Sequence, residues 1–175
     1  RWAKPARPVA PVVDGHALFA TAVATARLQA GRPQVTGIGP CVVVGVGYPG
    51  EAPFNAERRQ RDLLPVPGGA GRFLESIVAE FLPEIGRTVP LDASRRALVG
   101  HSYGGLFALH ALFTRPGLFE AHVAGSPSIW WNERAILPFE QDFRNAASTG
   151  AGRLLMTVGG REQDTGPLLD PRRAT

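Results

Sequence analysis

Short apolar runs alternate with amphipathic stretches along most of the chain. Five runs have the character of strands, at residues 9–13, 41–46, 97–99, 121–124 and 154–158. Helical spacing is found between or after them, at residues 17–30, 72–85, 106–113 and from Asn132 onward. This order predicts an α/β fold with a mostly parallel sheet and helices on both of its faces.

Prolines modify two of these predicted elements. Pro11 interrupts the first strand and cannot donate to a sheet ladder, which weakens the prediction of a strand there. In residues 72–85 an apolar side chain recurs at every fourth position from Phe73 to Ile85, but Pro83 is expected to kink or shorten this helix. Residues 41–46 form a β-branched run typical of a strand buried on both faces.

Residues 51–67 show no apolar periodicity. We therefore predict a long loop there, lying over the carboxyl ends of the strands, where open α/β sheets bind ligands. The helix over residues 17–30 is expected to stop at Gly31, Arg32 and Pro33.

The segment Gly100-His101-Ser102-Tyr103-Gly104 follows one predicted strand and opens onto a predicted helix. That context matches a nucleophile elbow, a strained turn that presents a serine hydroxyl and needs small residues two positions away on either side. Ser102 is therefore the candidate nucleophile. A purely structural turn is the alternative.

A second glycine pattern, Gly45-x-Gly47-x-x-Gly50, fits a dinucleotide-binding fingerprint. That fingerprint needs a helix directly behind the glycines, whereas Pro49 and a loop-like segment follow here. We interpret it as a glycine-rich turn leaving a buried strand.

Composition indicates one domain over residues 1–175, with 44% hydrophobic residues. The net charge of +4 comes from scattered arginines without interleaved aromatic residues, so we expect no nucleic-acid partner. Cys41 is the single cysteine, and no run approaches the roughly 18 apolar residues of a membrane span. We expect a cytoplasmic location, with the periplasm as the alternative because the chain begins at Arg1 and not at Met.

The chain resembles the esterase D-like branch of the α/β hydrolases, and within it the bacterial enzymes similar to ferric-siderophore esterases. The resemblance runs over nearly the whole chain and is carried by residues 13–19, 44–48, 59–65, 68–74, 99–106 and 126–131. Its most specific segments are Arg-x-x-Asp-Leu-x-Pro at 59–65 and Ser-Pro-Ser-x-Trp-Trp at 126–131.

The resemblance implies a serine ester hydrolase without cofactor or metal. Ser102 would attack the ester carbonyl, and the backbone N–H of Tyr103 would donate to the oxyanion. A second oxyanion donor is expected from the backbone of Gly15 or His16.

The resemblance also implies substrate contacts. Arg59 matches the family's arginine near the pocket and could hold an anionic or catecholate substrate, or be an ordinary surface arginine. Trp130 and Trp131 could wall the pocket, or at least one of them could pack under a loop.

The catalytic triad is incomplete in this sequence. The chain order Ser, acid, His makes Glu162 or Asp164 the candidate acid, with Glu162 matching the family's segment, although either could be a solvated loop carboxylate. No histidine follows the last strand. The four present are His16, His101, His110 and His122. His101 is a poor base because it projects away from its neighbour Ser102, and His110 and His122 are expected in the core or on a helix face.

Two hypotheses explain the missing base: a fragment that is incomplete at its N- and C-terminal strands, or a relative that lost the base. We expect a hydrolase of small-molecule carboxylic esters or lactones, with a siderophore trilactone as one possible substrate. An acyltransferase and a non-catalytic binding module of the same fold are the alternatives. The sequence does not indicate an oligomeric state.

Overall fold

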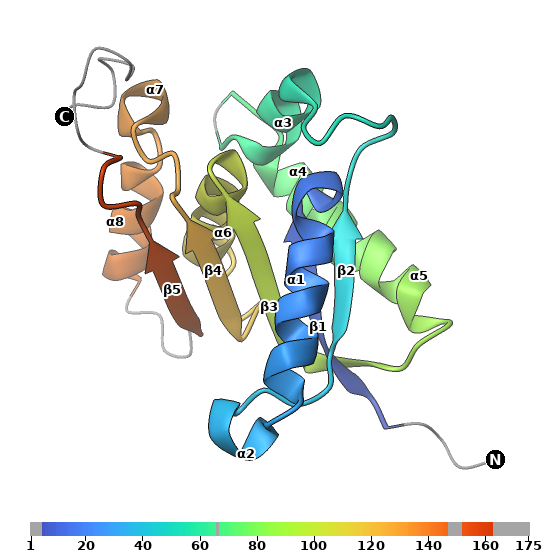
Figure 1. Ribbon diagram of the computed structural model, residues 1–175. Coiled ribbons are helices and arrows are strands. Elements are labelled where there is room, and N and C mark those ends of the chain that lie inside the picture. The colour runs from blue at the N-terminus through green and yellow to red at the C-terminus, as the bar shows by residue number, and fades with distance from the viewer. Residues whose placement is uncertain (1–4, 66, 147–151, 163–175) are drawn as a thin grey trace.

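The computed structural model describes residues 5–65, 67–146 and 152–162. They form a five-stranded sheet of order β2-β1-β3-β4-β5 in which all neighbouring strands are parallel (Figure 1). The strands are β1 (Arg7–Val13), β2 (Val42–Val46), β3 (Leu91–His101), β4 (Ala121–Gly125) and β5 (Arg153–Thr157). The predicted parallel sheet is confirmed.

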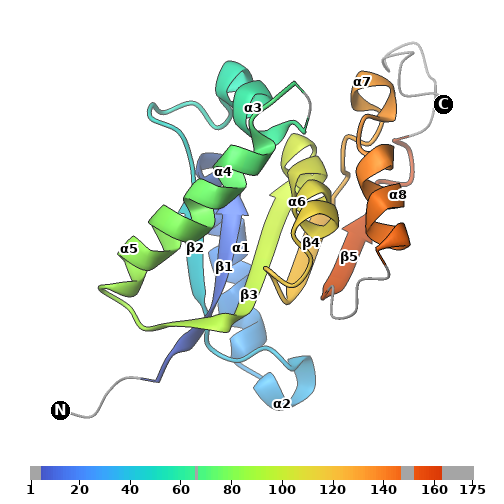
Figure 2. The same ribbon diagram turned by 180° about the vertical axis from the view of Figure 1, so that it is seen from behind.

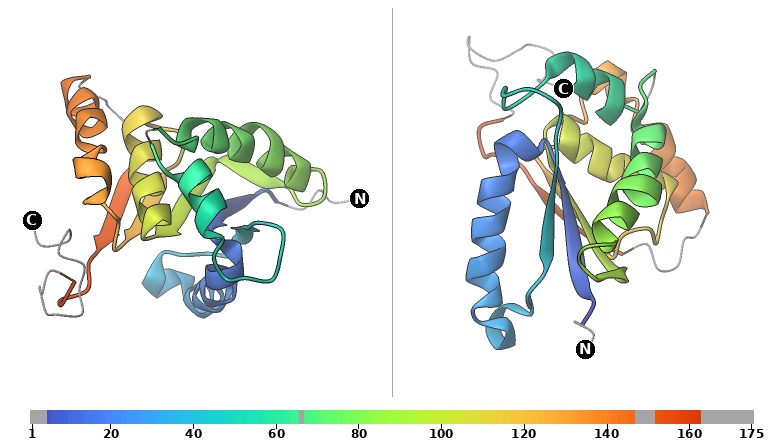
Figure 3. Two further views of the ribbon diagram at one scale, coloured as in Figure 1. Left: turned by 90° about the horizontal axis from the view of Figure 1, so that it is seen from above. Right: turned by 90° about the vertical axis from the view of Figure 1, so that its right-hand side faces the viewer.

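Helices cover both faces of the sheet, as predicted. Helix α1 (Gly15–Ala30) lies on one face. Seen from behind, the other face carries α4 (Ala70–Ser76), α5 (Leu82–Gly86), α6 (Tyr103–Thr114) and α8 (Leu137–Asn145) (Figure 2). Helices α3 (Ala56–Leu63) and α7 (Trp131–Arg134) stand above the carboxyl ends of the strands, whereas α2 (Pro33–Thr36) lies at the opposite end (Figure 3).

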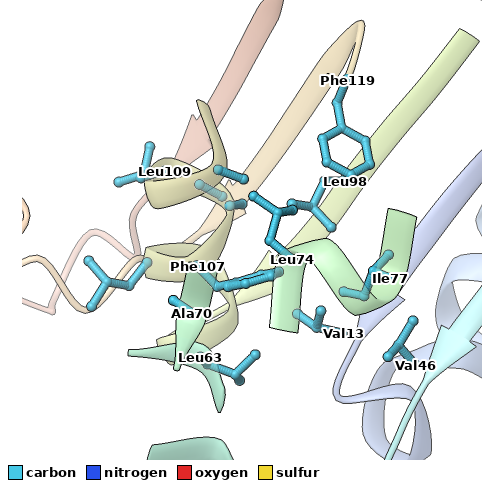
Figure 4. Packing of buried hydrophobic residues seen from close by; sticks show 14 of the residues in the cluster. Val13, Val46, Leu63, Ala70, Leu74, Ile77, Leu98, Phe107, Leu109 and Phe119 are labelled. Atoms are coloured by element: carbon cyan, nitrogen blue, oxygen red, sulfur yellow. The ribbon is translucent and has the colours of Figure 1, made fainter. Parts of the chain in front are cut away.

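The main core lies between the sheet and helices α4 and α6. Figure 4 shows Leu74 of α4, Phe107 of α6 and Leu98 of β3 in one cluster, all almost fully buried. Each buried Leu or Phe side chain stabilises the fold by about 1.5–3 kcal/mol relative to exposure. Helix α6 is buried along most of its length, so the element that follows Ser102 is held firmly against the sheet.

The strand with Pro11 is an inner strand. β1 pairs with β2 on one side, where Pro11 lies opposite Val44, and with β3 on the other. The pairing with β3 changes register between Arg7 and Val9. The missing N–H of Pro11 therefore does not prevent a central strand here.

The prediction of a loop over residues 51–67 is wrong, because this segment contains helix α3. The side chain of Asn55 caps the helix by accepting a hydrogen bond from Arg58 N at 3.0 Å. The helix is polar along most of its length and buries Asp62 and Leu63 only at its end. It therefore lacks the apolar periodicity by which a helix is recognised.

The helix predicted over residues 72–85 is present as three consecutive helical segments from Ala70 to Gly86. α4 is followed by a π-helical turn, η1 (Ile77–Phe81), in which Leu82 N donates to Ile77 O, and then by α5 with Pro83 in its first turn. Pro83 does not shorten the helix, because helical residues continue to Gly86. A wider π-helical turn precedes the proline. The helix expected from Asn132 is also divided: α7 contains Asn132 and Glu133 with positive φ, and α8 starts at Leu137.

Strand β5 is exposed along its whole length. It is an edge strand, and Leu154, Leu155 and Met156 have exposed side chains. Within the described ranges, no helix is both long and apolar enough to cross a membrane.

Candidate active site

Ser102 lies at the turn between β3 and α6 and has φ 57 and ψ −116. This conformation is rare for a residue with a side chain and is kept only where the surroundings enforce it. A Cβ on Gly100 would lie 2.1 Å from Gly104 O, and a Cβ on Gly104 would lie 2.7 Å from Val13 Cγ2. The strand and helix thus approach too closely for any residue but glycine at these two positions. The predicted elbow geometry is present.

Hydrogen bonds fix the Ser102 backbone to the loop after β4. Ser102 N donates to Gly125 O at 2.9 Å, and Ser128 N donates to Ser102 O at 3.2 Å. The hydroxyl oxygens of Ser102 and Ser128 are 3.2 Å apart. The Ser102 side chain is half-buried and Ser128 is buried. The Ser-Pro-Ser segment therefore holds the candidate nucleophile.

Tyr103 is the first residue of α6, so its N–H belongs to the first turn, where amides lack partners within the helix and the dipole favours negative charge. This is the position expected of an oxyanion donor. Gly15, the second predicted donor, is buried at the start of α1, where a Cβ would lie 2.9 Å from Gly45 C. Its neighbour Asp14 lies against Gly104, with Oδ2 3.4 Å from the position of a Gly104 Cβ. The starts of α1 and α6 are therefore adjacent.

The side chain of Arg59 in α3 lies beside the starts of α1 and α6. Its Nε donates to Asp14 Oδ1 at 2.9 Å, and its guanidinium lies 5.2 Å from the ring centroid of Tyr103. Burial raises the pKa of the Asp14 carboxyl, and the hydrogen bond from Arg59 opposes that rise. Arg59 is thus part of a buried ion pair next to the elbow and is not a solvated surface arginine.

Glu162 lies just beyond β5 and is anchored to the β4 side of the sheet. Ser126 Oγ donates to Glu162 Oε1 at 2.5 Å, and Gly159 N donates to the same oxygen at 2.9 Å. Ser126 has φ 40 and precedes Ser128 by two residues. Glu162 is therefore ordered beside the loop that holds Ser102. Asp164, the other candidate acid, lies outside the described residues.

The two tryptophans differ in their surroundings. Trp131 packs against the core cluster and also lines a groove of about 460 Å³ with Arg61 and Arg72. Trp130 is half-buried. A neighbouring groove of about 520 Å³ lies between Tyr48, Phe73 and α3, and neither groove is lined by Ser102. The expected pocket wall at Trp130 and Trp131 therefore stays a prediction.

The histidines are not placed to deprotonate Ser102. His110 and His122 are buried against Phe139 and Phe119, and burial lowers the pKa of each to about 4. In the part of the chain that the structure describes, the Ser102 hydroxyl has a hydrogen bond with Ser128 and none with an imidazole. His16 lies over Gly47, where a Cβ would be 2.8 Å from its Nδ1.

Packing accounts for the glycines of the rejected dinucleotide pattern. A Cβ on Gly45 would lie 3.0 Å from Phe19 Cδ2, and Gly47 has His16 above it. The next helix after Gly50 starts at Ala56 and not directly behind the glycines. Both glycines allow α1 to pack closely on β2.

Sequence reasoning missed three site residues. Asp14, Ser126 and Ser128 lie within segments that carry the family resemblance, and Asp14 also follows a strand directly and stands before a glycine. Neither serine has an individual signal that assigns it a role. All three act through contacts between elements that lie far apart in the chain.

Comparison with known proteins agrees with this geometry. The family model "Esterase" matches residues 4–175. The chain is 37% identical over 146 residues to the ferri-bacillibactin esterase BesA of Bacillus subtilis, covering 74% of this chain and 50% of that protein. It is 41% identical over 176 aligned positions to the siderophore enterobactin esterase of Emericella nidulans, covering 87% of this chain and 57% of that protein.

A solved structure supports the fold independently. The BES protein from Bacillus cereus superposes with a TM-score of 0.81 at 36% identity, covering 90% of this chain and 65% of that one. This chain thus spans about half the length of the curated relatives that it matches. The chain belongs to the esterase family whose members include siderophore esterases, with the α/β-hydrolase type of fold.

Proposed function

We propose that the protein is a serine ester hydrolase that acts on small-molecule carboxylic esters or lactones. The observation that carries this proposal is the strained Ser102 at the amino terminus of the buried helix α6. Ser102 Oγ adds to the ester carbonyl while its proton passes to solvent water, and the Tyr103 N–H donates to the resulting oxyanion. Collapse of this intermediate breaks the C–O bond of the ester, and the leaving oxygen takes a proton from water to depart as the alcohol. The acyl-enzyme that remains is then hydrolysed by water to the free acid and Ser102.

Siderophore lactones are the proposed substrate class. The names of the relatives support it, since they include esterases of bacillibactin, enterobactin and triacetylfusarinine C. Arg59 suits such substrates because a guanidinium beside the nucleophile can bind an anionic oxygen of the substrate. Trp130 would contact flat parts of the substrate and Trp131 would support it from the core side.

Glu162 is the proposed acid. Two hydrogen bonds hold its carboxylate between the ends of β4 and β5, where it could orient an imidazole. In this proposal Ser102 is the nucleophile, Tyr103 the oxyanion donor and Glu162 the acid, while no described imidazole is hydrogen-bonded to Ser102 Oγ. We therefore expect this 175-residue chain to acylate slowly at neutral pH.

A fluorophosphonate probe followed by mass spectrometry tests the proposal. We expect slow, stoichiometric labelling of Ser102 and none in Ser102→Ala. Thermal unfolding of the variant controls for misfolding. Labelling that persists in Ser102→Ala, or its absence from the folded wild-type chain, would overturn the serine hydrolase. Rapid ester turnover that disappears in Ser102→Ala would instead show that the chain does hold a base.

A further inference from the structure

Asp14 uses its carboxylate in an unusual way for a residue at the start of a helix. It joins β1 to α1 in the left-handed region, with φ 55 and ψ 47, and its carbonyl accepts hydrogen bonds from Ala17 N and Leu18 N. An aspartate at this position commonly caps the helix with its side chain. The Asp14 side chain makes no such bond and points to Arg59 instead.

The resulting ion pair is almost completely enclosed. The side chains of Asp14 and Arg59 are 1% and 12% exposed. Asp14 Oδ2 is buried without a hydrogen-bond partner in the described ranges and lies against Gly104 in the first turn of α6. Burying a carboxylate with one oxygen unsatisfied is costly, so its position beside the nucleophile indicates a role beyond packing.

Arg59 is fixed from three sides. Its guanidinium carbon lies 4.9 Å from the ring centroid of Phe54 and 5.2 Å from that of Tyr103, while Nε is bound to Asp14. Within the described residues, Nε is the only nitrogen of this side chain with a hydrogen bond. The N–H groups of the two terminal nitrogens therefore remain available to a ligand. They belong to a guanidinium that lies beside Tyr103, the residue after Ser102.

We propose that Asp14 is a positioning residue: it holds Arg59 in this slot so that the terminal nitrogens bind an anionic group in the non-reacting part of the ester substrate. This inference rests on the proposed function and deepens it. The substrate class is an ester that carries a carboxylate or a comparable anion. Asparagine at position 14 retains an oxygen that accepts from Arg59 Nε, whereas alanine removes it.

The position of Arg59 can be measured without any activity. A buried, hydrogen-bonded Nε–H exchanges slowly with solvent and gives a separate NMR signal, assigned by its loss in Arg59→Lys. We expect this signal in the wild type and in Asp14→Asn, and its loss in Asp14→Ala. Succinate should shift it saturably in the first two proteins. Glu84→Gln, which breaks the exposed ion pair with Arg87, is the matched control and should change nothing.

Steady-state kinetics test whether Arg59 favours ester substrates that carry an anionic group. We compare 4-nitrophenyl hemisuccinate, which is anionic, with 4-nitrophenyl levulinate, its neutral analogue. A hydrogen bond to a charged group corresponds to roughly a tenfold to hundredfold change in binding. Asp14→Ala should therefore raise KM for the hemisuccinate at least about tenfold, with kcat and the levulinate KM changed less than about threefold. Asp14→Asn should restore the low KM for the hemisuccinate.

The outcomes separate this inference from the proposed function. A chain that hydrolyses neither ester and is not labelled at Ser102 counts against the hydrolase, while the NMR signal and its response to succinate still decide the role of Asp14. If Asp14→Ala keeps the slowly exchanging signal and its succinate response, the positioning role is refuted. Two results would show that Asp14 is only a structural residue. One is an equal loss of kcat/KM on both esters in Asp14→Ala, and the other is an Asp14→Asn variant that behaves like Asp14→Ala.

Discussion

The hydroxyl of Ser102 lies 3.2 Å from the hydroxyl of Ser128, and the same two residues are joined by a backbone hydrogen bond of 3.2 Å. Two contacts therefore tie the elbow after β3 to the loop after β4. Ser128 is 3% exposed, so its hydroxyl has little access to water as a substitute partner.

Ser128→Ala should make the nucleophile less ordered. We expect the rate of fluorophosphonate labelling at Ser102 to fall roughly threefold to tenfold and the free energy of unfolding to fall by about 1 kcal/mol, the value of one hydrogen bond. Labelling kinetics and urea unfolding measure the two effects. Ser94→Ala removes an exposed hydroxyl bound to Asp92 and is the control. An unchanged labelling rate in Ser128→Ala would contradict the role of this contact.

The sequence predicts the sheet and the elbow well because both depend on local patterns. The strand before Ser102, the helix after it and the two glycines at Gly100 and Gly104 are close in the chain, and their spacing is set by packing. Helix α3 was missed because a polar helix has no apolar period. The contact between Asp14 and Arg59 joins residues 45 positions apart, and no periodicity reports such a pair.

Gly100→Ala should disrupt the elbow. A Cβ there would lie 2.1 Å from Gly104 O and 2.3 Å from Gly104 C, and both are backbone atoms that cannot move without shifting α6. We expect a loss of at least about 3 kcal/mol in the free energy of unfolding, or failure to fold. Gly71→Ala is the control, because nothing lies within 4 Å of the new Cβ and alanine favours a helix by about 1 kcal/mol. Equal stability of the two variants in urea unfolding would show that the elbow is not close-packed.

Glu162 should matter when an imidazole is supplied from solution. If its carboxylate orients and stabilises an imidazolium, added imidazole should accelerate fluorophosphonate labelling of Ser102 several-fold in the wild type and less than about twofold in Glu162→Gln. Glutamine keeps an oxygen for Ser126 Oγ and Gly159 N, so the loop should remain in place. Glu84→Gln, an exposed residue of α5, controls for the loss of charge. Equal acceleration of labelling in the wild type and in Glu162→Gln would show that Glu162 does not orient the imidazole.

The two buried histidines should make the fold sensitive to acid. Burial lowers the pKa of His110 and of His122 from 6.5 to about 4, so the folded state keeps both neutral while the unfolded state binds protons. Stability should then be complete above about pH 6.5 and decline as the pH falls toward 4, by on the order of 3 kcal/mol for each histidine. Asp14 acts in the opposite direction, because its raised pKa makes the folded state take up a proton in acid.

Replacing one of these histidines should remove its share of the pH dependence. His122 is fully buried, and neither ring nitrogen forms a hydrogen bond of standard geometry within the described residues, although the Arg153 backbone partly opposes the fall in its pKa. His122→Leu should therefore cost no strong hydrogen bond there. Urea unfolding at pH 7 and pH 5 should show a smaller difference for His122→Leu than for the wild type. His16→Gln alters an exposed histidine and should keep the wild-type difference. A His122→Leu variant with an unchanged difference would mean that His122 is protonated as easily in the folded state as in the unfolded chain.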